Sequence, residues 1–457
     1  MRWIMGLSVF IGVILASTFL GVGVRAEDEG ILIVSEEVSS QFPDGISFRI
    51  SLKSQSAIDD IRVFYKSMRS GITSYGLLEF DAGTEVQAYY LLDAGSGGER
   101  GLGAFVPPGS RFEYSFEIKN KSGVVLRTQP KEFVYLDSRF EWRSIAQEPL
   151  TVYHYGPTDK RAEDILQASL RAVERMSRVL GVEKVQPINI VAYNNYRHMV
   201  VALPPRPQAI SQDLVTEGQA FANLGVLMML AFNEDAEGVA SHEITHIVLD
   251  DAAGQAYNIL PMWLNEGLAE YGNVLPTEDY DEALLYGAYT RRLKPLWHLR
   301  TFVGDPNDVI IGYGQARSVV AYLINTYGEE KMAQFLKELQ DILSIDRTMM
   351  QVYGFDQRGL DSEWRVHLGL RPLKVADAAG EPDSLGLAPA TEETPEASDT
   401  QTPMPKEDDT QSDPISPGCS GVSGSSSRIG VDPFILLLLA GPIGFLPFRR
   451  FTRRRKV

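Results

Sequence analysis

The sequence predicts an α+β protein in which a small all-β sandwich precedes a larger mixed domain, with a membrane anchor at the C-terminal end. Three observations lead to this prediction. Residues 29–138 alternate apolar and polar side chains, residues 148–372 combine helical spacing with short apolar runs, and residues 431–448 are apolar and precede a basic tail. A period of two is typical of half-buried strands, whereas apolar residues three and four apart are typical of helices.

The first region contains several short alternating stretches, separated by turns such as Asn120-Lys121-Ser122-Gly123. Such spacing indicates a small antiparallel sandwich of the immunoglobulin or fibronectin kind. No cluster of its residues indicates chemistry, so we interpret it as a spacer or a binding module. The predicted inward-facing residues are Phe48, Ile50 and Leu52, then Ile61, Val63 and Tyr65, then Phe112, Tyr114, Phe116 and Ile118.

The second region begins with a strand-like stretch at 150–155 and a helix predicted over 160–180. In that helix Ile165, Leu166, Leu170, Val173, Met176 and Leu180 share one face. Apolar runs at 187–193 and 225–232 then predict two buried strands, and the remainder to about residue 370 is mainly helical.

Composition limits the possible partners. The 457-residue chain has a net charge of −17, and its basic residues cluster at the last positions, which argues against binding to a phosphate backbone. We therefore expect no nucleic-acid partner. The single cysteine, Cys419, excludes an internal disulfide and a thiolate nucleophile in the globular part. The sequence does not indicate an oligomeric state.

Both ends of the chain carry targeting patterns. Residues 1–26 have a basic Arg2, a long apolar run and a small residue, Ala26, at the expected cleavage point, which predicts a secretory signal peptide. Because the run is long, an uncleaved anchor is the alternative. Residues 373–430 are acidic and rich in Pro, Ser and Thr, and too poor in large apolar side chains to form a core, which predicts a disordered linker.

The apolar segment 431–448 and the basic tail 449–457 predict a membrane span whose tail is cytoplasmic. This arrangement corresponds to a single-pass cell-membrane protein with its folded domains on the extracytoplasmic side. The span is short, and Gly418-Cys419 ahead of it resembles the bacterial C-terminal sorting signals that are cut near a Gly-Cys pair. A lasting anchor and a processed sorting signal therefore both remain open.

A pair of histidines marks the candidate site. His242, Glu243 and His246 lie in a helix predicted over 237–249, where the two imidazoles are one turn and about 6 Å apart. The apolar residues Ala240, Ile244, Ile247 and Val248 gather on the opposite side, so one face is expected to pack into a core. Two imidazoles at this spacing are suited to bind one cation, and Glu243 could reach a water on it without acting as a ligand. The alternative is a buried or capping histidine pair.

A second predicted helix, 261–272, supplies acidic residues. Glu266 and Glu270 share one face of it, although like charges four residues apart are unfavourable. A nearby cation with its imidazoles would explain the pairing, and a catalytic zinc site needs a third protein ligand. Two solvated glutamates on an exposed helix are the alternative.

These residues resemble the gluzincin metallopeptidases. His242-Glu243-x-x-His246, followed by Trp-Leu-Asn-Glu-Gly-Leu-Ala-Glu-Tyr at 263–271, is similar to the peptidase MA-like group, which is related to the thermolysin and aminopeptidase N families. The resemblance covers about residues 150–370 and implies a gluzincin-like peptidase domain over 148–372. It implies one Zn²⁺ ion as cofactor, Glu266 as its third ligand, and Glu270 as the residue that orients a ligating histidine. The distance between His246 and Glu266 is one residue longer than in aminopeptidase N-like enzymes, which a loop at 251–260 could absorb.

A further match concerns the oxyanion. Aminopeptidase N-like enzymes carry a tyrosine at the start of a later helix, and the matching residue in the segment 312–323 is Tyr313. A packing tyrosine is the alternative, and His298 is the other candidate for the role. The exopeptidase signature Gly-Ala-Met-Glu-Asn is absent from the chain, and residues 224–230 could form an edge strand that pairs with an extended substrate. Both features favour an endopeptidase over an aminopeptidase.

The expected function is that of a membrane-anchored zinc metallopeptidase acting on a peptide or protein substrate. Zinc would be held by His242, His246 and Glu266, Glu243 would act as general base, and zinc with Tyr313 would stabilise the oxyanion. The alternative from another class is a cell-surface adhesion or interaction protein with a structural or inactive zinc site. A zinc hydrolase with a non-peptide substrate is a further alternative.

Overall fold

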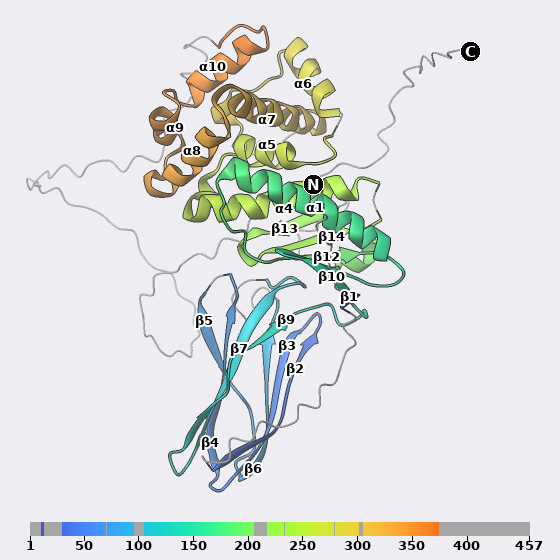
Figure 1. The fold of residues 1–457 in the computed structure, drawn as a ribbon, viewed down its shortest axis with the longest axis vertical. Helices are drawn as coiled ribbons and strands as arrows, with labels where there is room; N and C mark the ends of the chain where they lie inside the picture. The colour runs from blue at the N-terminus through green and yellow to red at the C-terminus, as the bar shows by residue number, and fades with distance from the viewer. Residues whose placement is uncertain are drawn as a thin grey trace, which may run out of the picture. The chain divides into compact units, whose positions relative to one another are not determined.

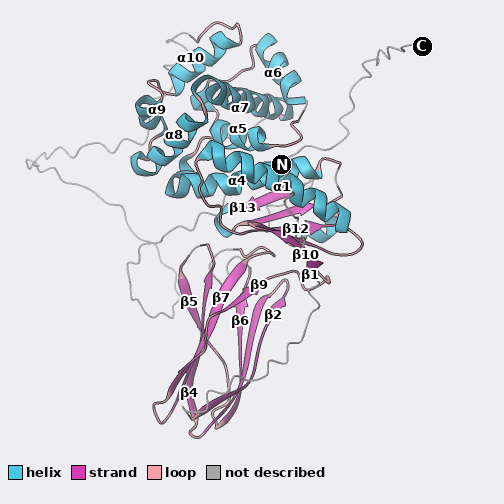
Figure 2. Ribbon diagram, in the orientation of Figure 1, coloured by secondary structure: helices cyan, strands magenta, loops and turns pink. Residues whose placement is uncertain are grey.

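The computed structural model describes residues 11–12, 30–69, 71–95, 105–204, 217–232, 234–277, 279–300 and 305–373. The described residues up to Pro372 belong to one compact unit. Figures 1 and 2 show antiparallel sheets built from the first part of the chain, and helices gathered with a second sheet built from the later part. The predicted α+β class is confirmed.

The first region forms two antiparallel sheets around one core. One sheet has the order β2 (Ile31–Gln41), β3 (Gly45–Ser54) and β6 (Glu85–Asp93). The other has the order β5 (Thr73–Leu77), β4 (Ile58–Ser67), β7 (Arg111–Asn120) and β8 (Val125–Arg127), with β9 (Lys131–Val134) also paired to β7. All the predicted inward-facing residues of β3, β4 and β7 are buried in this core, so the period-two prediction is confirmed.

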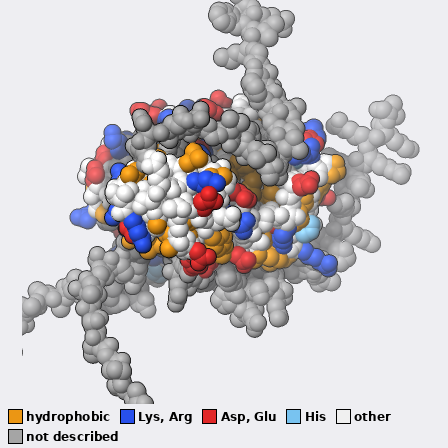
Figure 3. Space-filling view, turned by 90° about the horizontal axis from the view of Figure 1, so that it is seen from below, with side chains coloured by type: hydrophobic (Ala, Val, Ile, Leu, Met, Phe, Trp, Pro, Cys, Tyr) orange, Lys and Arg blue, Asp and Glu red, His pale blue; other side chains and the backbone are white. Residues whose placement is uncertain are grey.

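The outward faces of these strands carry charged side chains in pairs. Lys53 lies 3.0 Å from Glu85 across β3 and β6, and Arg127 lies 2.6 Å from Glu117 across β8 and β7. On the face of the molecule in Figure 3, acidic and basic side chains are interspersed. Opposite charges on neighbouring strands therefore accompany the apolar inward face.

The second region is built on a six-stranded sheet with the order β1-β10-β11-β12-β14-β13. Strands β11, β12 and β14 are parallel, and β13 runs antiparallel to β14. The bounds are β1 (Ile11–Gly12), β10 (Arg143–Gln147), β11 (Leu150–His154), β12 (Ile188–Tyr193), β13 (Gly218–Phe221) and β14 (Val226–Leu230).

Strand β14 corrects one sequence prediction. Residues 224–230 were expected to form the edge of the sheet, but β14 pairs with β12 on one side and with β13 on the other. Among the described residues the edge strand is therefore β13, four residues that the apolar pattern did not mark. A strand covered on both faces is apolar throughout, and this explains why the runs of β12 and β14 were the ones visible in the sequence.

The two long helices α1 (Asp159–Leu180) and α4 (Ala236–Ala253) pack on one face of the sheet, and the short α2 (Tyr196–Val200) contacts β12 and β14. Figure 2 shows α1 and α4 above the strands. Helix α1 begins one residue before its predicted start and ends at Leu180. The next residue, Gly181, has a φ of 72°, the left-handed conformation that glycine adopts readily.

The remaining helices follow α4 in the chain. Helix α5 packs on both α4 and α7, and α6 packs on α7. Their bounds are α5 (Met262–Gly272), α6 (Asp279–Tyr289), α7 (Pro306–Tyr327), α8 (Glu329–Ile342), α9 (Ile345–Val352) and α10 (Gln357–His367). The described residues also form the short 3₁₀ segments η1 (Ala222–Leu224), which precedes α4, η2 (Gly254–Ile259) and η3 (Leu296–His298).

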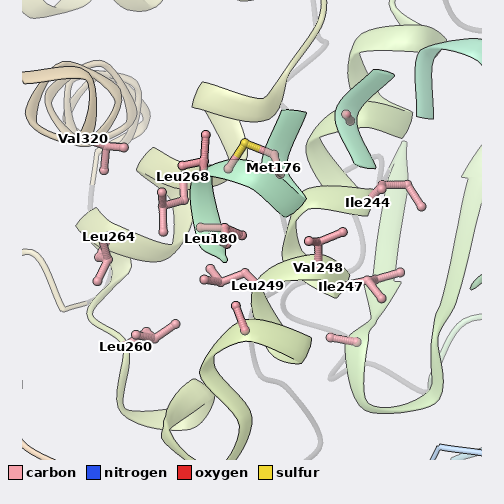
Figure 4. Packing of buried hydrophobic residues seen from close by; sticks show 14 of the residues in the cluster. Met176, Leu180, Ile244, Ile247, Val248, Leu249, Leu260, Leu264, Leu268 and Val320 are labelled. Atoms are coloured by element: carbon pink, nitrogen blue, oxygen red, sulfur yellow. The ribbon is translucent and has the colours of Figure 1, made fainter. Parts of the chain in front are cut away.

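Helix α4 is buried on all sides, which corrects the prediction of a single core face. Ile244, Ile247 and Val248 enter the main core, as expected, but the histidine side is also covered. Figure 4 shows the apolar side chains of α4 packed among those of α1 and α5, including Met176 and Leu268. Because α4 contacts α1, α5, β13 and β14, no face remains for solvent.

The targeting segments fall almost entirely outside the described residues. Of the predicted signal peptide only Ile11 and Gly12 are described, as strand β1 beside β10. Of the predicted linker only Leu373 is described, and the segment 431–448 and the tail 449–457 are not. Within the described part of the chain, every helix is too short or too polar to span a bilayer.

Candidate metal centre

The structure brings His242, His246 and Glu266 together. Both histidines project from α4, and Glu266 projects from α5, which packs against α4. Oε2 of Glu266 lies 3.4 Å from Nε2 of His242 and 3.7 Å from Nε2 of His246. One donor atom from each of the three residues lies within 4.8 Å of the other two. Ligands at zinc-bond length around a tetrahedral ion are about 3.4 Å apart, so the spacing fits a small cation.

The other nitrogen of each imidazole is held by a second residue. Nδ1 of His242 is 2.9 Å from Oε1 of Glu270, and Nδ1 of His246 is 2.8 Å from Oδ1 of Asn265. An acceptor at Nδ1 places the proton there and leaves Nε2 as the lone-pair donor. When the imidazoles are neutral, each Nε2 can therefore act as a metal ligand, the arrangement that histidine ligands of metals adopt.

Several polar atoms at this point have no protein partner in hydrogen-bonding geometry. They are Nε2 of His242, Oε2 of Glu266, Oε1 of Glu243 and Oε2 of Glu270, all fully enclosed. Burying such atoms unpaired is costly, so a cluster of them in one place calls for a group that would satisfy them. Two imidazole nitrogens and a carboxylate oxygen are the donor set that zinc prefers. The residues thus fit a zinc ion.

Glu243 lies on the same helix but makes a different contact. Its Oε2 accepts a hydrogen bond of 2.9 Å from the backbone N–H of Ala220 in β13. Burial raises the pKa of Glu243, while His246 and His242 oppose that change. The close approach of β13 needs Gly218, because a Cβ there would lie 2.9 Å from Cγ of Glu243. Strand β13 therefore packs directly against the side chain of Glu243 and fixes its carboxylate by a hydrogen bond.

The electrostatics follow from burial and from the paired glutamates. Burial lowers the pKa of His242, but Glu266 and Glu270 outweigh this and raise it to about 10. Burial raises the pKa of Glu270, and its hydrogen bond to His242 more than reverses that change. Without an ion, the two carboxylates therefore favour a proton on Nε2 of His242, and an ion bound there would replace that proton.

Tyr313 lies on α7 and is buried beside the cluster. Burial raises the pKa of its hydroxyl well above the usual value, and the negative charges of Glu266 and Glu243 act in the same direction. Its ring stacks on Tyr280 of α6, with centroids 5.4 Å apart and planes at 10°. Gly314 allows this, since a Cβ at that position would lie 2.3 Å from the carbonyl oxygen of Tyr280.

His298, the other candidate for the oxyanion role, is placed differently. It is exposed at the end of η3, where its ring contacts Trp297 at 5.8 Å. The charges of Glu266 and Glu270 raise the pKa values of two other side chains, Tyr313 and Tyr280, so these tyrosines lie near the cluster. The geometry therefore favours Tyr313 for a role beside the cluster.

Two contributors were not predicted from the sequence. The motif contains Asn265 without assigning it a role, although its position directly before Glu266 could have indicated one. Ala220 acts through its backbone N–H, for which the sequence gives no side-chain signal. The segment 251–260, expected to be a loop, instead continues α4 to Ala253 and then forms η2.

Comparison with known proteins supports part of this assignment. Residues 167–369 match the family model described as Peptidase MA superfamily. No curated protein matches the chain.

Similarity to solved structures is low. A bromine derivative of BhCBM56 is 12% identical and covers 22% of this chain and 88% of its own, with a TM-score of 0.15. A family 56 carbohydrate-binding module, described as a β-1,3-glucan binding domain, is 18% identical and covers 22% and 96%, with a TM-score of 0.14. An aminopeptidase N family protein from Idiomarina loihiensis is 9% identical and covers 73% and 72%, with a TM-score of 0.26.

The family match includes all of α4 and α5, and therefore every residue of the His242, His246 and Glu266 cluster. The part of the chain that carries this cluster matches the Peptidase MA superfamily, and the match suggests a peptidase.

Proposed function

We propose that the chain is a zinc-dependent peptidase in which His242, His246 and Glu266 hold the ion. The observation that carries this proposal is the enclosed cluster of donor atoms, in which Nε2 of His242 and Oε2 of Glu266 have no hydrogen-bond partner. A second residue contacts the Nδ1 atom of each imidazole. When bound, zinc would polarise a carbonyl group and lower the pKa of a water molecule to about 7. Glu270 and Asn265 orient the two imidazoles.

Glu243 is the general base. Its Oε2 is fixed by the N–H of Ala220, and its Oε1 is available to accept a proton from the attacking water. The water oxygen forms a bond to the peptide carbonyl carbon, and the C–N bond breaks as the amine takes the proton that Glu243 holds. Because burial raises the pKa of Glu243, the carboxylate retains that proton more readily than an exposed glutamate would.

The hydroxyl of Tyr313 is the donor to the developing oxyanion. Tyrosine is protonated at neutral pH, and burial raises the pKa of Tyr313 further, so the hydroxyl keeps the proton that a hydrogen-bond donor needs. The stack on Tyr280 limits the motion of the ring. The role of Tyr313 rests on this placement and on the matched position in aminopeptidase N-like enzymes.

The edge strand β13 offers a place for the substrate backbone. In an antiparallel strand the N–H and C=O of one residue point to the same side. Since the N–H of Ala220 points away from β14 to Glu243, its C=O also points away from β14, where an extended peptide could pair with it. A strand-like substrate passing the cluster is compatible with cleavage inside a chain, which favours an endopeptidase.

The membrane location is a separate proposal that rests on sequence patterns alone. A signal peptide at 1–26 and an anchor at 431–448 would place the peptidase on the extracytoplasmic side of the cell membrane. Fractionation of the full chain and of a chain that ends at residue 430 tests this. Recovery of both in the soluble fraction would refute the anchor.

The peptidase proposal is tested with a quenched fluorescent peptide library and metal analysis of the purified full chain. The wild type is expected to contain one zinc and to cleave peptides, and Glu243→Gln is expected to keep the zinc and lose about 10²- to 10⁴-fold in turnover. Tyr313→Phe should keep the zinc and lose about 10²-fold or more. Glu237→Gln, at the first turn of the same helix and paired with Arg161, is the matched control.

Two results would overturn this proposal. Wild-type turnover in Glu243→Gln would exclude it as the base. Zinc without cleavage of any library peptide would favour an interaction protein with a structural site.

A further inference from the structure

We infer that Arg69 of the sandwich is a positioning residue for the proposed catalytic site, because it joins the edge strand region to α4. This inference rests on the proposed function for its consequence in catalysis. It gives the sandwich a role beyond that of a spacer. Arg69 follows β4, and its side chain is 7% exposed.

The guanidinium makes one hydrogen bond to each of two elements. Nη1 donates to the carbonyl oxygen of Ala222 at 2.9 Å, and Nη2 donates to Oδ2 of Asp251 at 3.1 Å. Asp250 lies near as well, with Oδ2 at 3.9 Å from Nη1. The side chain of Asp251 is 9% exposed, so this ion pair is enclosed on both sides.

Both residues that Arg69 contacts are near residues of the proposed catalytic site in the sequence. Ala222 begins η1, two residues after Ala220, whose N–H binds Glu243. Asp251 lies on α4, five residues after His246. A single planar group thus holds the end of β13 and the end of α4 at a fixed separation, and Glu243 and its N–H partner lie on those same two elements.

The backbone around the contact is shaped to accept Arg69. Gly225, which follows η1, has a φ of 63°, and a Cβ there would lie 2.5 Å from Nε of Arg69. Oδ2 of Asp251 also accepts from the N–H of Gln186, so the carboxylate has defined partners on two sides. Phe105 makes a second contact between the sandwich and strand β13. Its ring packs on that of Phe221, with centroids 5.9 Å apart.

A purely structural role for Arg69 would predict a different outcome from a positioning role. If Arg69 only attached the sandwich, then loss of any comparable contact should have the same effect. Asn189 provides that comparison, because its Nδ2 donates to the carbonyl oxygen of Gly109 at 2.8 Å, whereas its bond to Gly225 uses the backbone N–H, which a substitution keeps. Asn189→Ala is therefore the matched control.

The experiment compares Arg69→Met, Arg69→Lys and Asn189→Ala in the full chain, below their unfolding temperatures. Amide hydrogen exchange is measured on a peptide covering 217–225, together with zinc content, kcat and KM on a library peptide that the wild type cleaves. Arg69→Met is expected to exchange faster in that peptide, keep its zinc and lose about 10- to 100-fold in kcat with a smaller change in KM. Arg69→Lys, which keeps the charge but not the two-pronged geometry, should fall between.

Unchanged exchange at 217–225 in both Arg69 variants would overturn the inference, whether or not the chain cleaves peptides. Equal effects in Asn189→Ala would also overturn it, because they would show general attachment. Absence of cleavage in the wild type would refute the proposed function instead, and the exchange data would still decide the role of Arg69.

Discussion

The sandwich and the helix pair α4 and α5 fill their interiors with different kinds of side chain. The sandwich core consists of aliphatic, phenylalanine and tyrosine residues, such as Phe48, Val63 and Phe116. Between α4 and α5, by contrast, His242 and Glu266 are 3% and 2% exposed, as enclosed as the apolar residues around them. Both regions are well packed, but between α4 and α5 the enclosed atoms without a hydrogen-bond partner belong to side chains that converge on one point, those of His242 and Glu266.

This difference distinguishes buried residues that stabilise the fold from buried residues that serve a function. Enclosing a charge costs free energy unless it is paired and hydrogen-bonded, whereas enclosing an apolar side chain is favourable. A chain selected for folding alone would fill the space between α4 and α5 as it fills the sandwich. Local departures from that rule are expected where a ligand completes the structure.

The substitution Glu266→Leu is the strongest test of whether the buried carboxylate serves the ion and not the fold. We expect loss of bound zinc and of cleavage, because two imidazoles alone are a poor zinc site. In the metal-free state, however, the unfolding temperature should be no lower than that of the wild type, since an apolar side chain replaces a buried carboxylate. Calorimetry and metal analysis of both chains measure this.

Glu237→Leu, at the start of the same helix, controls for the loss of a glutamate there and should keep its zinc. A clear fall in the metal-free unfolding temperature of Glu266→Leu would show that the carboxylate contributes to the fold.

The opposite change in the sandwich is Phe48→Ala. Phe48 is 1% exposed and contacts the rings of Tyr65, Tyr90, Tyr114 and Phe116. Its removal should cost about 3–5 kcal/mol in the free energy of unfolding, because it leaves a cavity between the sheets. Zinc content and turnover measured below the unfolding temperature should not change, and a tenfold loss of zinc affinity would contradict the separation of the two regions.

The two regions also differ in what could be predicted from their sequences. The strands of the sandwich were predictable because one face meets the core and the other meets solvent, so the period of two is visible in Phe48, Ile50 and Leu52. In α4 the same kind of inference failed for the histidine face, because neighbouring elements cover every side. A helix without a solvent face has no polar stripe to reveal its orientation.

Within the site, the residues with a defined chemical spacing were predicted and their partners were not. His242, His246 and Glu266 were found from the motif, and the structure brings them together. The edge strand β13 was missed because it has only four residues, and the pairing of Arg69 with Asp251 joins positions 182 residues apart. No local pattern encodes a contact of that kind.

Asn265→Ala is the finest test of the comparison, because it changes no proposed ligand. Oδ1 of Asn265 holds Nδ1 of His246, and its own Nδ2 is buried without a partner in hydrogen-bonding geometry. Loss of this contact should free the imidazole to rotate and weaken zinc binding by about 10- to 100-fold. Competition with a chromogenic chelator measures the affinity, and Asn307→Ala, on the exposed first turn of α7, is the matched asparagine control.

An unchanged affinity in Asn265→Ala would mean that the packing of α4 and α5 alone orients His246. The hydrogen bond between Asn265 and His246 would then serve the fold rather than the ion. A loss of affinity without a loss of metal-free stability would instead separate the two roles at a single side chain. This is the same separation that the apolar core of the sandwich and the α4–α5 contact display at a larger scale.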